Sequence, residues 1–103
     1  MGNAEYWLLK ADPFNSVNED FHFKHQGAIL SLGFMNVHND FERDLEKHMT
    51  AFFNWLDWDL GMAYVLRRKD LLKVIENNEE IFKDLNVSDL TDEFYAVAWI
   101  DWS

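Results

Sequence analysis

The apolar residues of this chain recur with two different spacings, and the change between them falls near residue 39. Before that point, residues 5–11 and 27–35 are dense in aromatic and aliphatic side chains, and residues 17–23 alternate apolar with polar ones, as half-buried strands do. Asp12 and Pro13 end the first segment with a turn signal. The three segments predict antiparallel strands, with a short helix as the alternative for residues 27–35.

Beyond residue 39 the apolar spacing becomes helical. Asn39 and Glu42 have the spacing of a capping box, in which the asparagine side chain accepts a hydrogen bond from an early helical N–H group. Apolar residues then recur at steps of three and four: Phe41, Leu45, Met49, Phe52 and Leu56. This stripe predicts a first helix over about residues 40–58, and the same spacing predicts a second helix over about residues 69–85.

Two further segments are rich in aromatic and β-branched residues. Residues 62–68 suit a short strand, with an extension of the first helix past Gly61 as the alternative, and residues 94–102 suit a final strand, with a helix as the alternative. No Pro- or Gly-rich linker divides the 103 residues, which form one domain. The predicted fold is α+β, with a small antiparallel or mixed sheet packed against two main helices.

The chain is strongly acidic. Nine Lys and Arg residues against nineteen Asp and Glu residues give a formal net charge of −10. Such a charge repels nucleic acids and anionic membranes, and it accelerates association with basic proteins. Cysteine is absent, which excludes disulfides and thiolate zinc sites. Neither a secretory signal nor a membrane-spanning apolar stretch is present in the sequence, so it predicts a soluble, cytoplasmic protein.

One four-residue pattern, Trp-aliphatic-Asp-Trp, occurs twice, at residues 55–58 and 99–102. On the predicted helix, Trp58 lies outside the apolar stripe and Asp57 lies on the polar side. Tryptophan is enriched among the residues that dominate binding energy, and an adjacent carboxylate steers a cationic partner. The alternative for each Trp is packing at the edge of the core. We favour an interface role for the Asp and the final Trp of each copy.

The acidic residues are concentrated toward the end of the chain. Residues 76–103 contain eight Asp and Glu and one basic residue, Lys83, so most of the net negative charge gathers there. A solvated helix face commonly mixes both signs, and an acidic segment with a single cation therefore indicates a function. The predicted partner-binding residues combine this segment with the Trp motifs: Trp55, Asp57, Trp58, Asp89, Asp92, Glu93, Asp101 and Trp102.

Other clusters of reactive or basic side chains are less specific. His22 and His25 lie near acids, but a lone His-x-x-His pair on a strand or turn places two imidazoles poorly for one metal ion. Arg67, Arg68 and Lys69 form the only basic cluster, which suits the end of a helix, pairing with the acids that follow, or, more weakly, a phosphate site. No catalytic residue, cofactor or metal is predicted. A small metal-dependent or acid/base hydrolase is the alternative of another class.

The chain is small and acidic, lacks cysteine, and contains acidic and aromatic stretches such as NWLDWD and SDLTDEF. These features together resemble those of a known group of proteins. The chain resembles bacterial immunity proteins, the acidic inhibitors encoded beside colicins and contact-dependent growth-inhibition toxins. The resemblance implies a protein that covers the basic cleft of a nuclease toxin, with that toxin domain as its partner and no direct contact with nucleic acid or membrane. A phage-type nucleic-acid mimic that blocks a restriction or CRISPR effector is the alternative binding protein.

Overall fold

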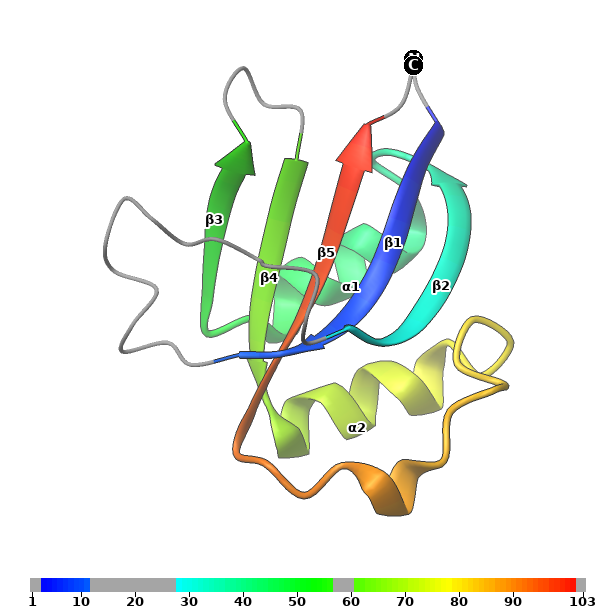
Figure 1. Ribbon diagram of the computed structural model, residues 1–103, viewed down its shortest axis with the longest axis vertical. Helices are drawn as coiled ribbons and strands as arrows, with labels where there is room; N and C mark the ends of the chain where they lie inside the picture. Colours follow the sequence, from blue (N-terminus) through cyan, green and yellow to red (C-terminus); the bar gives the residue numbers. More distant parts are fainter. Residues whose placement is uncertain (1–2, 12–27, 57–60, 102–103) are drawn as a thin grey trace.

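The computed structural model describes residues 3–11, 28–56 and 61–101, and the side chains of residues 28 and 53–56 are not part of that description. Figure 1 shows the elements, which in chain order are β1 (Asn3–Lys10), β2 (Ala28–Asn36), α1 (Asp40–His48), β3 (Ala51–Leu56), β4 (Gly61–Arg67), α2 (Arg68–Asn77), the 3-10 turn η3 (Val87–Asp89) and β5 (Phe94–Asp101). The predicted α+β fold is therefore confirmed.

The five strands form one antiparallel sheet in the order β2-β1-β5-β4-β3. The last strand in sequence, β5, lies in the centre and joins the hairpin β1–β2 to the hairpin β3–β4. Strands were predicted at residues 5–11, 27–35, 62–68 and 94–102, and each is confirmed with small changes of its ends. The strand predicted at residues 17–23 lies outside the described residues.

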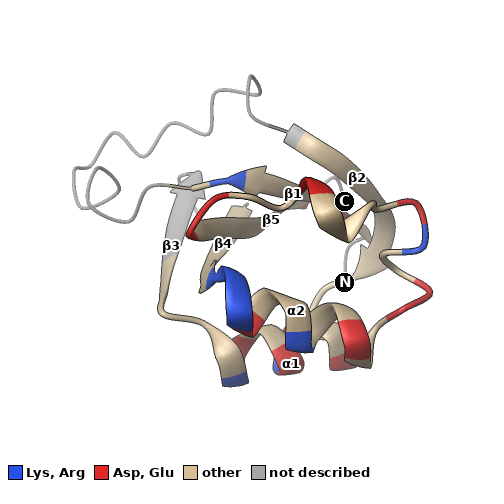
Figure 2. Cartoon of the chain, turned by 90° about the horizontal axis from the view of Figure 1, so that it is seen from below, with Lys and Arg blue, Asp and Glu red and all other residues tan. Residues whose placement is uncertain are grey.

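Both helices pack on the same face of the sheet, as Figure 2 shows. The core between the layers contains Tyr6 from β1, Tyr95 and Val97 from β5, and Phe41 from α1. Aromatic rings connect the elements, because the Phe41 ring lies 5.9 Å from that of Tyr6 and 5.7 Å from that of Phe82. The opposite face carries a second buried cluster of smaller side chains: Leu9, Ala63, Val65, Phe94, Ala96 and Ala98. Neither described helix combines the length and the apolar character that crossing a bilayer requires.

The first predicted helix, at residues 40–58, is wrong at its C-terminal end. The chain leaves the helix after His48, Met49 adopts an extended conformation, and residues Ala51–Leu56 form β3. Aromatic side chains favour strands, and in this segment the pairing with β4 outweighs the helical spacing of the apolar residues. Phe52, predicted to line the core side of the helix, is 53% exposed instead.

The second predicted helix, at residues 69–85, also ends too late, since α2 stops at Asn77. The Asn78 side chain donates hydrogen bonds to the Val74 carbonyl, at 2.8 Å, and to the Asp44 carboxylate of α1, at 2.9 Å. Asparagine competes in this way with the helical backbone, and turns follow. Phe82 is nevertheless buried in the core, although it lies in the turns that follow α2.

Candidate functional site

The described acids of the predicted partner-binding set lie toward two ends of the sheet. Asp89, Asp92 and Glu93 precede β5, and Asp101 ends it. The eight residues of β5 span roughly 25 Å at the usual rise of a strand. In Figure 1 the start of β5 is next to α2, and its C-terminal end lies at the opposite end of the strands. The structure therefore does not bring these four acids together.

The second residues of the two Trp-aliphatic-Asp-Trp motifs lie in matching register on either side of β4. Leu56 of β3 and Ile100 of β5 both pair with Gly61. A register shift between Asn54 and Leu56 places Trp55 at a β-bulge. The helical geometry predicted for the first motif is therefore wrong, because Trp55 and Leu56 belong to a strand. Asp57, Trp58 and Trp102 lie outside the described residues, so their predicted exposure stays a prediction.

Trp99, which opens the second motif, belongs to the core. Its side chain is 5% exposed, and its Nε1 group donates a hydrogen bond of 2.9 Å to a carboxylate oxygen of Glu42. For this Trp the alternative interpretation, a ring that packs in the core and satisfies its N–H group, is the correct one.

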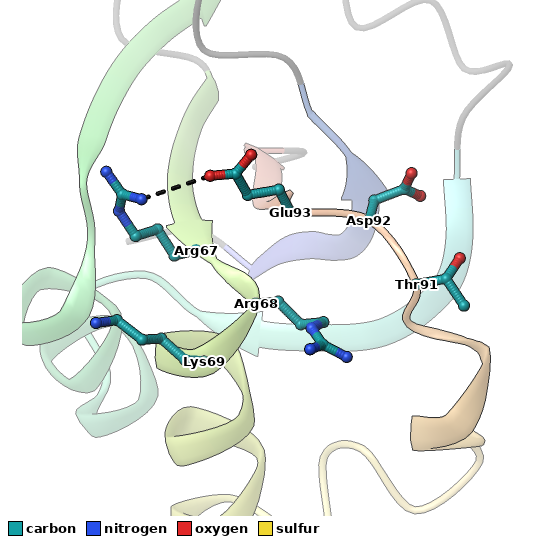
Figure 3. Close-up of a pocket in the computed structure, with 6 residues that line it drawn as sticks. All are labelled: Arg67, Arg68, Lys69, Thr91, Asp92 and Glu93. Carbon is teal, nitrogen blue, oxygen red and sulfur yellow. Dashed lines mark ion pairs between the residues drawn. The ribbon is translucent and has the colours of Figure 1, made fainter.

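Asp92 and Glu93 face cations of the same molecule. Figure 3 shows a pocket of about 640 Å³ at the start of α2, lined by Arg67, Arg68, Lys69, Thr91, Asp92 and Glu93. Glu93 pairs with Arg67 at 3.6 Å, and Asp92 pairs with Lys10 of β1 at 3.3 Å. The basic cluster thus starts a helix rather than ending one, and its predicted pairing with later acids is confirmed for Arg67. These two carboxylates are partly neutralised within the protein.

Five other exposed carboxylates form what we call the acidic surface: Glu76, Glu79, Glu80, Asp84 and Asp89. They extend from the end of α2 to η3, and the acids along this part of the chain are visible in Figure 2. Glu80 pairs with Lys83 at 3.4 Å. Within the described part of the chain, the other four make no ion pair or hydrogen bond through their side chains. This surface is the main concentration of uncompensated charge that the structure describes.

The charges on α2 suit the helix dipole only in part, because Asp70 is an acid in the first turn but most of the other charges are placed unfavourably. Arg68 and Lys69 lie in its first turn, where the dipole favours anions, and Glu76 lies near its last turn, where it favours cations. Each such placement costs roughly 0.3–1 kcal/mol at an exposed site. No side chain caps the first turn either. The acids at the end of α2 are therefore not explained by the stability of the helix.

Glu42 is a buried carboxylate, 1% exposed, at the start of α1. Its backbone N–H donates to the Asn39 side chain at 2.7 Å, which confirms the predicted cap. One carboxylate oxygen accepts hydrogen bonds from the Tyr64 hydroxyl, at 2.8 Å, and from Trp99, and the other accepts from the His38 backbone N–H, at 2.6 Å. The carboxylate therefore connects α1 to β4 and β5. The capping-box spacing marks Glu42 in the sequence, but nothing in the sequence indicates its contacts with the two rings.

The tyrosines around Glu42 stay protonated. Burial raises the pKa of Tyr64 far above its ordinary value of 10, and the hydrogen bond to Glu42 acts in the same direction. Burial and then the negative charge of Glu42 likewise raise the pKa of Tyr6. Both hydroxyl groups therefore keep their protons in the folded state well into the alkaline range.

Raising the pH above about 10 is expected to destabilise the fold. Below that pH, Tyr6 and Tyr64 are protonated in both states and contribute no pH dependence. Above it they ionise only in the unfolded chain, so the free energy of unfolding falls by about 1.4 kcal/mol per pH unit for each tyrosine. Urea unfolding measured between about pH 9 and about pH 11 gives this slope. The Tyr64→Phe variant should show a shallower slope, and an unchanged slope would contradict the assignment.

Among the described residues, no group of three His, Asp or Glu side chains is placed to hold a metal ion. His22 and His25 lie outside that part of the chain, and the hydrolase alternative stays untested. Comparison of the chain with protein-family models, with curated proteins and with solved structures gives no match.

Proposed function

We propose that this protein is an acidic protein-binding inhibitor of the immunity-protein type, which neutralises a basic nuclease toxin by occluding its nucleic-acid-binding or active-site cleft. The observation that carries the proposal is the acidic surface, whose carboxylates are exposed and, apart from Glu80, unpaired within the described chain. Carboxylates in this state can replace phosphates in a basic cleft without first breaking an internal ion pair.

The position of the acidic surface supports the same function. Acids at the end of α2 oppose the helix dipole and repel one another, so they reduce the stability of the free protein. A cationic partner would remove both effects on binding, and complementary charge also accelerates encounter. Among the acids that the sequence predicts to contact a partner, Asp89 belongs to the acidic surface. Asp101 ends β5, and Asp57, Trp58 and Trp102 lie outside the described residues, so a partner contact by these four stays a separate prediction.

The test uses a basic nuclease domain whose reading frame adjoins the gene of this protein. We expect the purified protein to inhibit that nuclease stoichiometrically. We also expect its association rate to fall at least about tenfold between about 25 mM and about 250 mM salt, because screening weakens electrostatic steering. Absence of inhibition, or an association rate that does not change with salt, would contradict the proposal. Co-purification of a restriction or CRISPR effector from the host would instead support the nucleic-acid mimic.

A further inference from the structure

A shallow groove with a volume of about 400 Å³ lies between the edge strand β2 and the turn that follows α2. Its apolar lining comes from Leu32 and Met35 of β2 and from Ile81 of the turn, and all three side chains are partly exposed while they pack against the core. The yellow turn beside the cyan strand in Figure 1 marks its position. The groove therefore offers apolar surface beside the acidic surface.

Gly33 of β2 also lines the groove. This residue has a positive φ of 86°, and a Cβ atom placed on it would meet nothing within 4 Å. The conformation favours glycine, which leaves the backbone exposed to an incoming side chain.

The charged lining of the groove consists of two members of the acidic surface and one cation. Glu80 and Asp84 are exposed, and Lys83 lies 3.4 Å from the Glu80 carboxylate. A cation that approached Asp84 would find it without an internal partner in the described residues. The groove is complementary to a segment that carries positive charge next to an apolar side chain.

Strand addition at this edge is disfavoured. The pairing of β2 with β1 has two register shifts, and such irregularities at an edge strand oppose pairing with another chain. Ile29 and Phe34 on the same strand are nevertheless 42% and 62% exposed, so the edge presents apolar side chains to solvent. Recognition through side chains fits this edge better than recognition through the backbone.

We infer that the groove between β2 and the turn after α2 receives a segment of the basic partner in which one aliphatic side chain lies between two arginines or lysines. This inference rests on the proposed function, because that function supplies a basic protein as partner. The aliphatic side chain would contact Leu32, Met35 and Ile81, and one flanking cation would reach Asp84.

The probe is a capped synthetic peptide with the sequence Gly-Arg-Leu-Arg-Gly, titrated into the isotope-labelled protein. We expect amide shifts that centre on Gly33, Ile81 and Asp84. A peptide with glycine in place of leucine tests the apolar contact, and one with aspartates in place of the arginines tests the charge. Equal binding of the leucine and glycine peptides, or shifts spread over the whole acidic surface, would overturn the inference.

Two single variants and a matched control sharpen the test. Lys83→Gln removes the one cation of the groove and should tighten peptide binding by about threefold, a gain that misfolding cannot produce. Asp84→Asn should weaken it by a similar factor. Glu76→Gln removes the same charge from the acidic surface away from the groove lining and should have a smaller effect. An effect of Glu76→Gln as large as that of Asp84→Asn would show general electrostatic attraction and overturn the groove assignment.

The peptide result and the toxin result are separable. If the nuclease is inhibited but neither Lys83→Gln nor Asp84→Asn changes the affinity for nuclease or peptide, the groove inference fails and the proposed function stands. If the peptide binds at the groove but no adjoining nuclease is inhibited, the proposed function fails. The assignment of the groove as a site for a basic and aliphatic segment then stands without it.

Discussion

Replacing Glu42 with leucine is expected to lower the free energy of unfolding by about 3 to 5 kcal/mol. The substitution removes the acceptor of three donors, the Tyr64 hydroxyl, the Trp99 ring N–H and the His38 backbone N–H. A buried donor without a partner costs roughly 1–3 kcal/mol, and local relaxation recovers part of the sum. Urea unfolding followed by tryptophan fluorescence measures the loss.

Two companion variants separate hydrogen bonding from packing at this position. Glu42→Gln keeps the shape and one acceptor oxygen but places an NH₂ group near the other donors, so its loss of stability should be smaller. Adding Tyr64→Phe to Glu42→Leu removes one orphaned hydroxyl and should restore about 1 kcal/mol relative to Glu42→Leu alone. If Glu42→Leu unfolded at the same urea concentration as the unmodified protein, the carboxylate would have no role in joining α1 to the sheet.

Neutralising the unpaired members of the acidic surface is expected to slow association with the basic partner by about 10-fold to 100-fold at low salt. The variant combines Glu76→Gln, Glu79→Gln, Asp84→Asn and Asp89→Asn, and it leaves the pair of Glu80 with Lys83 in place. The replaced side chains are exposed, and their removal reduces repulsion at the end of α2. Stability should therefore stay unchanged or rise slightly, so the expected loss is specific to binding.

The control for this variant removes charge from another part of the protein. Asp40→Asn with Glu46→Gln neutralises two exposed acids of α1, and Glu79→Gln with Asp84→Asn neutralises two acids of the acidic surface. Both double variants have the same net charge. Stopped-flow association at low salt should show the larger effect for the second pair. Equal effects would mean that net charge alone governs association, without a specific contact surface.

The fold could be predicted from sequence where local preference and tertiary environment agree. The segments that became β1, β2, β4 and β5 are rich in aromatic, aliphatic and β-branched residues, and burial in a sheet favours the same types. The start of α1 was predicted from Asn39, because capping is a short-range hydrogen bond that depends on a few adjacent residues. The central position of β5 had no local signal, because it depends on pairing between distant segments.

At the C-terminal ends of both helices, tertiary contacts override the local pattern of the sequence. Phe52 fits the stripe of a helix and also favours a strand, and only the pairing of β3 with β4 decides between them. At the end of α2, Asn78 stops the helix with hydrogen bonds to Val74 and to Asp44 of α1, and the second of these is a tertiary contact. Periodicity alone does not contain this information.

The sequence predicts the excess of negative charge at the candidate site, but it does not predict which carboxylates form ion pairs with cations of the same chain. The excess of acids after residue 76 is plain in the sequence, and four members of the acidic surface have no described partner in the structure. The cations that neutralise Asp92 and Glu93, however, come from β1 and from the end of β4. The fold brings these cations next to the two carboxylates. A count of charges along residues 76–103 alone therefore overestimates the number of unpaired carboxylates.

The central position of β5 has a consequence for synthesis of the protein on the ribosome. Residues 94–101 are synthesised after the other described strands, and until then neither β1 nor β4 has the strand that pairs with both of them. Their inner edges stay open during translation, when neighbouring polypeptides compete for unpaired backbone groups. The described sheet is therefore complete only once β5 is present, and we expect a chain that ends before residue 94 to leave β1 and β4 without the strand that pairs with both.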